Sequence, residues 1–379
     1  MKIGIETLPF NTNYGGILQS YALMAYLKRI GHSPLLINYQ TDDESYLRLP
    51  FVIAQRLISK YILRRKNMPD IIPNWVYKKR NKNIEENCRL FIKDYINPKT
   101  KPIYTDFDLL RYNPLDCDAY IVGSDQIWRP EYFRLRKHAF FDFVSNKDAI
   151  LLSYAPSFGV DEWRYSPKET LKAKKQLSRF RAVSVREKFG VDSCKKYWNV
   201  EAKQVIDPTL LLEREDYINL SNNFATDNHC GRLFSYFLDR HEGEELLIQI
   251  IAKKYGHKPF NVYELNDRKK YQGFLIQPPI QLWIKSFMMA DYVITDSYHG
   301  CIFSIIFNKP FIVLGNKQRG IARITSLLED FGLRDRLLAS PLEVKEESVN
   351  KEIDWNSVND KLNFLKEYSK KFLTDNLIK

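Results

Sequence analysis

The chain has 379 residues, 44 % of them hydrophobic, and it carries a formal net charge of +12. This length suffices for two domains of ordinary size. No apolar stretch is close in length to the roughly 20 residues that a membrane-spanning helix needs. The N-terminus MKIGIETLPF lacks the longer apolar core and cleavage site of a signal peptide, so we expect a cytoplasmic protein.

The cysteines, histidines and basic residues exclude several kinds of site. The five Cys residues are scattered without a CxxC pair, and the six His residues form no HxH or HxxxH pattern. We therefore expect no disulfide framework, no bound metal ion and no other cofactor. No zinc-finger, RNA-recognition or basic-zipper pattern accompanies the positive charge, so nucleic acid is not an expected partner.

The chain opens with a predicted strand–loop–helix–strand unit. Residues 2–8 and 32–39 are the expected strands, and residues 17–30 have apolar side chains at helical spacing. Asn13, Gly15 and Gly16 lie in the loop before the helix. Adjacent glycines at a helix N-terminus allow a ligand to approach the backbone closely. These three residues are therefore candidate substrate contacts.

Residues 44–101 are predicted to be a helical, basic insertion beside the first sheet. Cationic side chains recur through the segment, with aromatic residues between them, at Lys60, Arg64, Arg65, Lys66, Lys78, Lys79, Arg80 and Lys82. Either a solvated surface or contact with an anionic membrane surface explains such a charge run.

Four further strands are predicted in the first half of the chain, at residues 117–122, 149–154, 182–185 and 204–206. Polar residues follow these strands, and Ser124, Asp125, Gln126 and Arg186 among them are candidate substrate contacts. Strands that end in polar or glycine-containing loops and alternate with helices are typical of a doubly wound α/β domain. We place this domain at residues 1–222.

The second half repeats the alternation after a polar loop at residues 220–230. Its predicted strands are at residues 233–237, 260–264, 292–294 and 310–314, and its predicted helices are at 243–254, 280–289, 301–307 and 321–331. We place a second α/β domain at residues 223–350. Residues 351–379, with a helix at 362–378, are expected to pack back on the first domain. A cleft between the domains is the expected ligand site.

The stretch DYVITDSYHG, residues 291–300, places His299 at the turn between a buried strand and a buried helix. Ligands of open α/β sheets bind near the carboxyl ends of strands, and a helix N-terminus there favours an anion. A lone histidine in such a turn is more often a helix cap or a core hydrogen-bonding residue. Its neighbouring motifs therefore decide its interpretation.

Six short motifs, in order along the chain, resemble those of the polysaccharide pyruvyl transferase family. They are Asn13-Tyr14-Gly15-Gly16 with Leu18–Leu23, Gly123–Trp128, Ser184–Glu187, Asp207–Leu211, Ala290–Gly300 with Phe303-Ser304, and the loop and helix around Arg323. The matches extend from about residue 1 to residue 336. The basic segment and the last part of the chain lie outside them.

This resemblance implies a GT-B-like arrangement of two Rossmann-like domains with an inter-domain cleft. It also implies transfer of a pyruvyl group from phosphoenolpyruvate to a sugar as a ketal, with release of phosphate. Family members act on sugars of cell-surface polysaccharides, often attached to a lipid carrier or built as cytoplasmic precursors. A lipid-linked acceptor makes an anionic membrane a better candidate partner for the basic segment than nucleic acid, and a solvated surface stays an equal alternative.

The resemblance assigns a proton-handling role to His299, because imidazole can give and take a proton near neutral pH. Phosphoenolpyruvate carries a phosphate and a carboxylate, so its site needs cationic groups. The candidates are Arg186, Lys317, Arg319 and Arg323. Some relatives carry Arg at the position of Ser297 and use it to hold the donor, so this chain must supply the charge from elsewhere.

Several site residues admit a structural interpretation as well. Arg186 is either a donor contact or a link to Asp207 or Glu187, and Asp125 is either a substrate contact or a helix cap. Asp296 either orients His299 or acts itself, and it is a candidate substrate contact together with Ser297.

Two other functions stay open from sequence. One is a GT-B-type glycosyltransferase that uses a nucleotide sugar, and the other is a non-catalytic sugar-binding scaffold of polysaccharide assembly. The acceptor sugar and the oligomeric state are not decided by these motifs.

Overall fold

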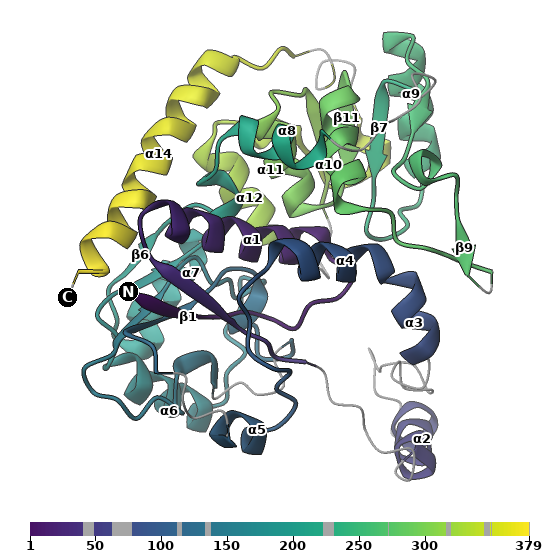
Figure 1. Cartoon of the computed structure of the whole chain (residues 1–379). Helices are drawn as coiled ribbons and strands as arrows, with labels where there is room; N and C mark the ends of the chain where they lie inside the picture. The colour runs from purple at the N-terminus through teal and green to yellow at the C-terminus, as the bar shows by residue number, and fades with distance from the viewer. Residues whose placement is uncertain are drawn as a thin grey trace.

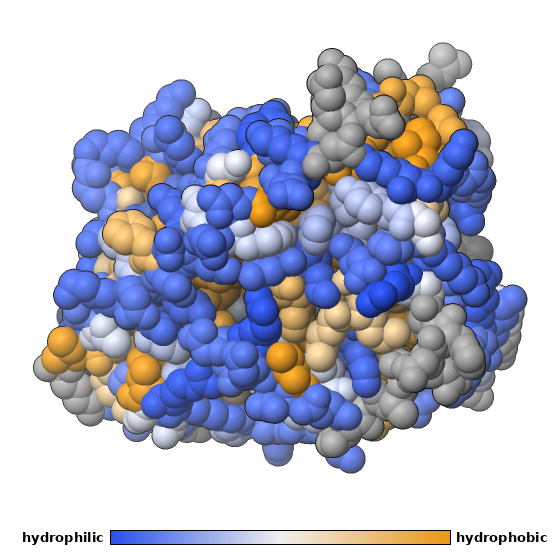
Figure 2. All heavy atoms as spheres, turned by 90° about the horizontal axis from the view of Figure 1, so that it is seen from above, coloured by the Kyte–Doolittle hydropathy of each residue, from blue (hydrophilic) through white to orange (hydrophobic). Residues whose placement is uncertain are grey.

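Two parallel β-sheets with flanking helices organise the computed structural model (Figure 1). The structure describes residues 1–40, 49–62, 78–111, 116–132, 138–222, 231–271, 273–315, 320–344, 349 and 351–378. Within these residues, no helix is both long and apolar enough to cross a membrane. Seen from above, the surface is mostly hydrophilic, and its apolar side chains lie in separate patches (Figure 2).

The first sheet has the order β2-β1-β3-β4, and all of its pairs are parallel. Its strands are β1 (Lys2–Glu6), β2 (Ser33–Ile37), β3 (Ala119–Val122) and β4 (Ile150–Ser153). A bridge between Leu152 and Ala182 leads on to a parallel pair, β5 (Val183–Val185) and β6 (Ala202–Gln204). Of the two central strands, β3 is apolar and buried along its whole length, and β1 is buried from Ile3 to Glu6, because helices cover both faces of such a sheet.

The helices of this first unit follow the expected alternation. They are α1 (Tyr14–Arg29), α6 (Pro167–Leu177), α7 (Lys188–Ser193), which continues into a π-helical turn (Cys194–Trp198), and α8 (Arg214–Ser221). Short 3₁₀ turns lie at Gln126–Trp128, His138–Phe140 and Pro208–Leu210. Helix α1 starts three residues before the predicted residue 17, so Gly15 and Gly16 belong to its first turn.

Residues 96–101 of the predicted helical segment form no helix, whereas its described residues before them are largely helical. They form α2 (Leu49–Leu57) with a π-helical turn (Ile58–Ile62), α3 (Lys78–Ile84) and α4 (Glu86–Tyr95), and α5 (Asp106–Arg111) follows. Helix α4 packs on α1, with Phe91 buried against the ring of Tyr21. Helix α2 stands apart from both sheets (Figure 1).

The second sheet has the order β13-β12-β11-β7-β8 and is also parallel. Its strands are β7 (Leu233–Tyr236), β8 (Pro259–Phe260), β11 (Tyr292–Thr295), β12 (Phe311–Leu314) and β13 (Leu337–Leu338). Its helices are α9 (Glu244–Tyr255), α10 (Ile280–Met289), α11 (Tyr298–Ile306) and α12 (Ile321–Asp330). A small antiparallel hairpin joins β9 (Lys270–Tyr271) and β10 (Phe274–Leu275), and 3₁₀ turns lie at Glu264–Asn266, Arg334–Arg336 and Pro341–Glu343.

The strand predicted at residues 260–264 is wrong beyond Phe260. The Asn261 side chain accepts hydrogen bonds from the backbone N–H groups of Tyr263 and Glu264. An asparagine that bonds its own downstream backbone forms a turn in place of a strand. The chain therefore leaves the sheet at Asn261.

The last helix, α14 (Trp355–Asn376), starts earlier than predicted because Asp354 caps it through the N–H groups of Asn356 and Ser357. It returns to the first sheet (Figure 1), where Ser369 Oγ accepts a hydrogen bond of 3.1 Å from the Ile206 N–H. The ring of Phe372 packs near that of Tyr154.

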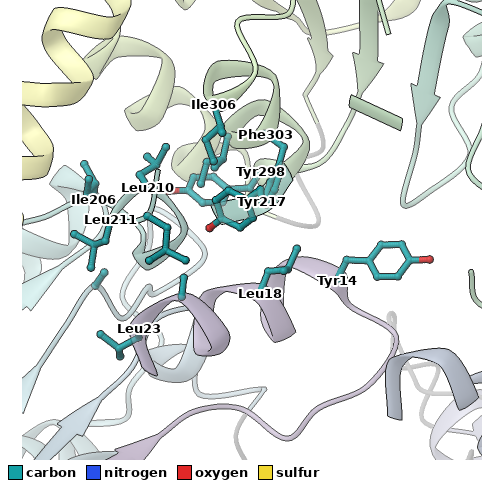
Figure 3. Close-up of a cluster of buried hydrophobic side chains, with 14 of the residues drawn as sticks. Tyr14, Leu18, Leu23, Ile206, Leu210, Leu211, Tyr217, Tyr298, Phe303 and Ile306 are labelled. Atoms are coloured by element: carbon teal, nitrogen blue, oxygen red, sulfur yellow. The ribbon is translucent and has the colours of Figure 1, made fainter. Parts of the chain in front are cut away.

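The main hydrophobic core runs without interruption from one sheet to the other. In Figure 3, Leu18 and Leu23 from α1 lie below Leu210, Leu211 and Tyr217, and Phe303 and Ile306 from α11 lie above them. The two sheets are therefore joined by apolar packing, and the cleft between them opens beside this core.

Candidate active site

A cleft of about 970 Å³ lies between the two sheets, at the carboxyl ends of their strands. Loops after β1, β3, β7 and β11 line it, with contributions from the starts of α1, α9, α11 and α12. Of the predicted site residues, it is lined by Asn13, Gly16, Asp125, Gln126, Ser297, His299 and Arg323. This is the position at which open parallel sheets bind ligands.

An ionic cluster forms the floor of the cleft around Asp207, which is fully buried. Its Oδ2 accepts a 2.7 Å hydrogen bond from Nη1 of Arg186 and lies 3.6 Å from Nε2 of His299. Burial by itself raises the pKa of the Asp207 carboxyl. Interactions with His299 and then with Arg186 outweigh burial and keep that pKa well below its usual range, so Asp207 is an anion under ordinary conditions.

Arg186 lies beneath the cleft lining, at the end of β5, and is 4 % exposed. Its guanidinium carbon is 4.3 Å from the centroid of the Tyr298 ring, and Nη2 is 3.8 Å from Oδ1 of Asp125. Among the described residues, its Nε and Nη2 are buried without a hydrogen-bond partner. Arg186 is thus linked to Asp207, one of the two alternatives, and still has free donors near the cleft.

Arg323 brings a second guanidinium to the cleft from the first turn of α12. Its guanidinium carbon is 5.6 Å from the Tyr298 ring centroid, and Nη1 is 3.9 Å from Oδ1 of Asp125. Burial first, and then the positive charge of Arg186, lower the pKa of Arg323. A cation that is desolvated beside another cation favours the arrival of an anion.

His299 enters the cleft from the first turn of α11. Ser297 caps this helix, because its Oγ accepts a 3.3 Å hydrogen bond from the Gly300 N–H. The ring of His299 lies so close to Gly15 of α1 that a Cβ atom there would overlap it. Gly15 therefore serves the close approach of the two domains, and Nε2 of His299 is buried without a hydrogen-bond partner among the described residues.

The polysaccharide pyruvyl transferase family model matches residues 13–318 of the chain. The chain belongs to this family. Membership indicates a transferase that modifies polysaccharides, and the matched range contains Asp125, Arg186, Asp207 and His299. Among curated proteins, none matches the sequence significantly.

Solved structures share the fold at low sequence identity. Trehalose-6-phosphate synthase OtsA is 10 % identical with a TM-score of 0.51, and the alignment covers 100 % of both chains. The UDP-GlcNAc 2-epimerase from Neisseria meningitidis is 9 % identical with a TM-score of 0.47, covering 100 % of this chain and 99 % of that one. An S. aureus MnaA structure with UDP is 13 % identical with a TM-score of 0.49, covering 99 % and 97 %. The predicted fold, two Rossmann-like domains in a GT-B-like arrangement, is confirmed.

The family motif after β3 forms the wall of the cleft opposite His299. Asp125 has φ 68° and ψ −172°, a backbone conformation that a residue other than glycine adopts at a cost of about 1–3 kcal/mol. Its carbonyl accepts a 2.8 Å hydrogen bond from the Ser157 N–H, and its carboxylate lies 3.4 Å from Nδ2 of Asn13. In this unusual backbone conformation, the Asp125 carboxylate lies within 4 Å of the guanidinium groups of both Arg186 and Arg323.

Two other predicted residues of this wall have structural partners. Ser124 is fully buried, and its Oγ lies 3.0 Å from Oδ2 of Asp207. Gln126 lines the cleft while its Oε1 accepts a 3.0 Å hydrogen bond from Nη1 of Arg129. Lys317 and Arg319 lie outside the described residues.

Asp296 does not orient His299, which corrects that part of the prediction. Its carboxylate accepts hydrogen bonds from the backbone N–H groups of Leu238 and Asp239, at 2.7 and 3.1 Å, and lies 2.9 Å from Nε2 of His241. The carboxylate within ion-pair distance of His299 is instead that of Asp207.

Sequence patterns missed three features of the site. Asp207 was considered only as a partner of Arg186, although it lies in a family motif. Tyr298, next to His299, has both guanidinium groups within cation–π distance of its ring, and its aromatic character was the only signal. The second-domain wall, which includes Tyr236, Asp239 and Tyr263, had no signal because its residues lie outside the recognised motifs.

Proposed function

We propose that the protein transfers the pyruvyl group of phosphoenolpyruvate to two hydroxyls of a sugar, forming a ketal and releasing phosphate. The observation that supports this most strongly is the placement of Arg323, buried and desolvated, on the cleft beside His299. Arg186 adds two buried donor nitrogens, Nε and Nη2, from the other domain. A small dianionic or trianionic donor matches this group better than a neutral molecule does.

The acid–base chemistry of the reaction can be assigned to His299. A protonated imidazole gives its proton to C3 of the donor, which becomes a methyl group, and C2 becomes cation-like. A sugar hydroxyl attacks C2 and returns its proton to the imidazole. A second hydroxyl then forms the other C2–O bond as the C2–O bond to phosphate breaks, and its proton leaves with the phosphate. Protons and electron pairs balance without a metal ion or redox cofactor.

Asp207 supports this cycle electrostatically. An ionised carboxylate 3.6 Å from Nε2 attracts a proton-bearing imidazole, and the low dielectric of a buried site strengthens that attraction. Asp207 is in turn fixed by Arg186 and by the N–H of Thr209, which donates a 3.0 Å hydrogen bond to Oδ1. We therefore assign Asp207 a positioning role.

A turnover experiment tests the proposed function. The protein is incubated with phosphoenolpyruvate and a panel of galactosides and other glycosides, and phosphate release and the mass of each sugar are measured. We expect phosphate release only with an acceptor present, in equal amount to the ketal formed. Turnover with UDP-sugars and none with phosphoenolpyruvate would instead identify a glycosyltransferase, and absence of any turnover would favour the sugar-binding scaffold.

A further inference from the structure

The cleft is much larger than its ionic floor, and its outer half has a different composition. From the floor it extends over the β7–α9 loop, the start of α9 and residues 261–263. We propose that this outer half binds the acceptor as a terminal, non-nucleotide sugar, neutral or amino, and that Asp296 positions its wall. The proposal rests on the proposed function, because it assigns the second substrate of the same cleft.

The charge of the outer half disfavours a nucleoside diphosphate. Among the described residues, Asp239, Glu244 and Glu245 line it, and Arg240 is the one Lys or Arg that accompanies them. Glu244 and Glu245 occupy the first turn of α9, the place where a helix would otherwise offer its N-terminus to a phosphate. Glu244 also closes that turn by accepting a 2.9 Å hydrogen bond from the His241 N–H. Carboxylates at this position repel a diphosphate.

The same side chains suit a hydroxyl-rich ring. Ionised carboxylates accept strong hydrogen bonds from hydroxyl or ammonium groups, and Asn261 and Gln277 offer amides. Tyr236 and Tyr263 provide aromatic surface, which gives affinity without charge. Tyr263 is fixed by a 3.0 Å hydrogen bond from its hydroxyl to Oε1 of Gln277.

Asp296 connects this wall to the ionic floor. Its side chain is fully buried and bonds the loop at Leu238, Asp239 and His241. It starts from the end of β11, three residues before His299, so the loop is fixed relative to the reacting group. Removal of its charge should loosen the acceptor wall and leave the donor site in place.

Direct binding tests the acceptor class without turnover. Calorimetry or saturation-transfer NMR is run on the full chain with methyl glycosides of galactose, mannose, glucosamine and N-acetylglucosamine, and with UDP-galactose. We expect at least one glycoside to bind and UDP-galactose not to bind. Glu244→Gln with Glu245→Gln should weaken glycoside binding at least tenfold, whereas Glu242→Gln, on the same loop but off the cleft, should not. Tighter binding of UDP-galactose, or no glycoside binding, would overturn the proposal.

A kinetic measurement tests the positioning residue. Asp296→Asn should raise the KM for the acceptor about tenfold, while the KM for phosphoenolpyruvate stays within about twofold, because only the loop contacts are weakened. Asp291→Asn, which pairs with Arg232 on the outside of the same element, is the control. An equal loss for both substrates would assign Asp296 to general stability. Glycoside binding without ketal formation would refute the proposed function and leave the acceptor site standing.

A separate observation concerns helix α2 and the π-helical turn after it. Among their described side chains none is buried, although large apolar residues are frequent, with Phe51 73 %, Tyr61 63 % and Ile58 47 % exposed. A short helix without tertiary packing is marginal in water. Residues 49–82 also contain nine Lys and Arg against one Asp, which is +8 of the chain's net charge of +12.

We infer that helix α2 and the π-helical turn after it dock on an anionic lipid bilayer, with their exposed apolar side chains in the interface and Arg56 and Lys60 toward the headgroups. Apolar area and basic charge together drive such binding, and each Lys or Arg near the surface contributes about 1 kcal/mol. Phe51 and Ile58 are seven residues apart and lie on one helix face. A lipid surface is favoured over an apolar protein partner because the charge is so one-sided.

Vesicle sedimentation of the full chain tests this docking. Binding is expected to phosphatidylglycerol–phosphatidylcholine vesicles and not to pure phosphatidylcholine, and it should weaken with salt. Phe51→Glu with Ile58→Glu should reduce it at least tenfold, whereas Phe364→Glu, on α14 and 66 % exposed, should not. Absence of vesicle binding would overturn the inference in favour of a solvated surface. Self-association that the double variant removes would overturn it in favour of a protein interface.

Discussion

The two ends of the cleft differ in how firmly their charges are fixed. At the floor, five charged or titratable residues are each at most 8 % exposed and are linked by ion-pair distances in the order His299, Asp207, Arg186, Asp125 and Arg323. In the outer half, Arg240 and Glu245 are exposed and Asp239 and Glu244 are partly exposed, so these charges are solvated. Buried charges interact strongly and tolerate little change, whereas solvated ones are screened. The floor is thus suited to one fixed chemistry, and the outer half to a specificity that can vary.

The largest expected effect comes from breaking the floor at its reacting group. His299→Ala should lower kcat by about 100- to 10,000-fold, the usual contribution of a general acid–base, with the fold intact. Phosphate release and thermal unfolding measure the two properties. His257→Ala, which removes a histidine that pairs with Asp291 away from the cleft, is the control. A near-normal rate in His299→Ala would remove this residue from the mechanism.

Removal of Arg323, the guanidinium that lines the cleft, should weaken the binding of phosphoenolpyruvate. Arg323→Ala is expected to raise the KM for phosphoenolpyruvate by about 10- to 100-fold, because a hydrogen bond to a charged group is worth about 1.5–3 kcal/mol. The KM for the acceptor should change less, because the acceptor is expected in the outer half of the cleft and Arg323 belongs to the floor. Arg334→Ala, an exposed arginine of the same domain, serves for comparison. An unchanged donor KM would place the donor elsewhere.

The close contact between α1 of the first domain and His299 of the second can be tested by substitution of Gly15 and, as a control, of its neighbour Gly16. Gly15→Ala should lower kcat by about 100-fold, because the new Cβ overlaps the His299 ring and such displacement spoils alignment. Gly16→Ala should cost much less, since its Cβ would lie 3.1 Å from Asn13 Nδ2 and 3.2 Å from Asp125 Oδ2, both on side chains. Equal effects of the two variants on kcat would contradict a specific contact between Gly15 and His299.

The smallest effect concerns a contact between the domains away from the cleft. Asp330 Oδ2 accepts a 2.9 Å hydrogen bond from Gln204, and burial raises the pKa of Asp330 from 3.8 to about 6. Below pH 3.8 the carboxyl is neutral in both states. As the pH rises from 3.8 to about 6, Asp330 ionises in the unfolded chain before it ionises in the folded one, so the free energy of unfolding falls. Above about pH 6 the carboxyl is ionised in both states, and the loss of folding stability is complete.

Asp330→Asn should therefore raise the melting temperature near pH 8, by the equivalent of about 1–2 kcal/mol, and leave it unchanged near pH 3.5. Thermal scans across that range measure the difference. Glu329→Gln, its neighbour on the same helix, is the matched control. A constant difference at all pH values would mean that ionisation of Asp330 is not the cause.

Much of the fold and part of the site could be predicted from sequence. Apolar β-branched runs and helical periodicity located the strands of both sheets except β13, because such patterns are local, whereas the two residues of β13 are too few to give one. The strand at 260–264 failed at Asn261, where a side-chain hydrogen bond of the kind that favours turns won over the apolar pattern. His299 and Arg323 were predicted as site residues because they lie in the family motifs, and the structure places both on the lining of the cleft.

Sequence by itself determined the family, the order of elements and the residues able to carry charge and protons, since those properties belong to short segments. Only the tertiary structure decided which of them meet. It paired His299 with Asp207, which is 92 positions away, turned Asp296 toward the β7–α9 loop, and set Arg186 beneath the cleft. Carboxylates compete for the nearest donors in a packed fold, and that competition depends on distances between segments that no local pattern contains.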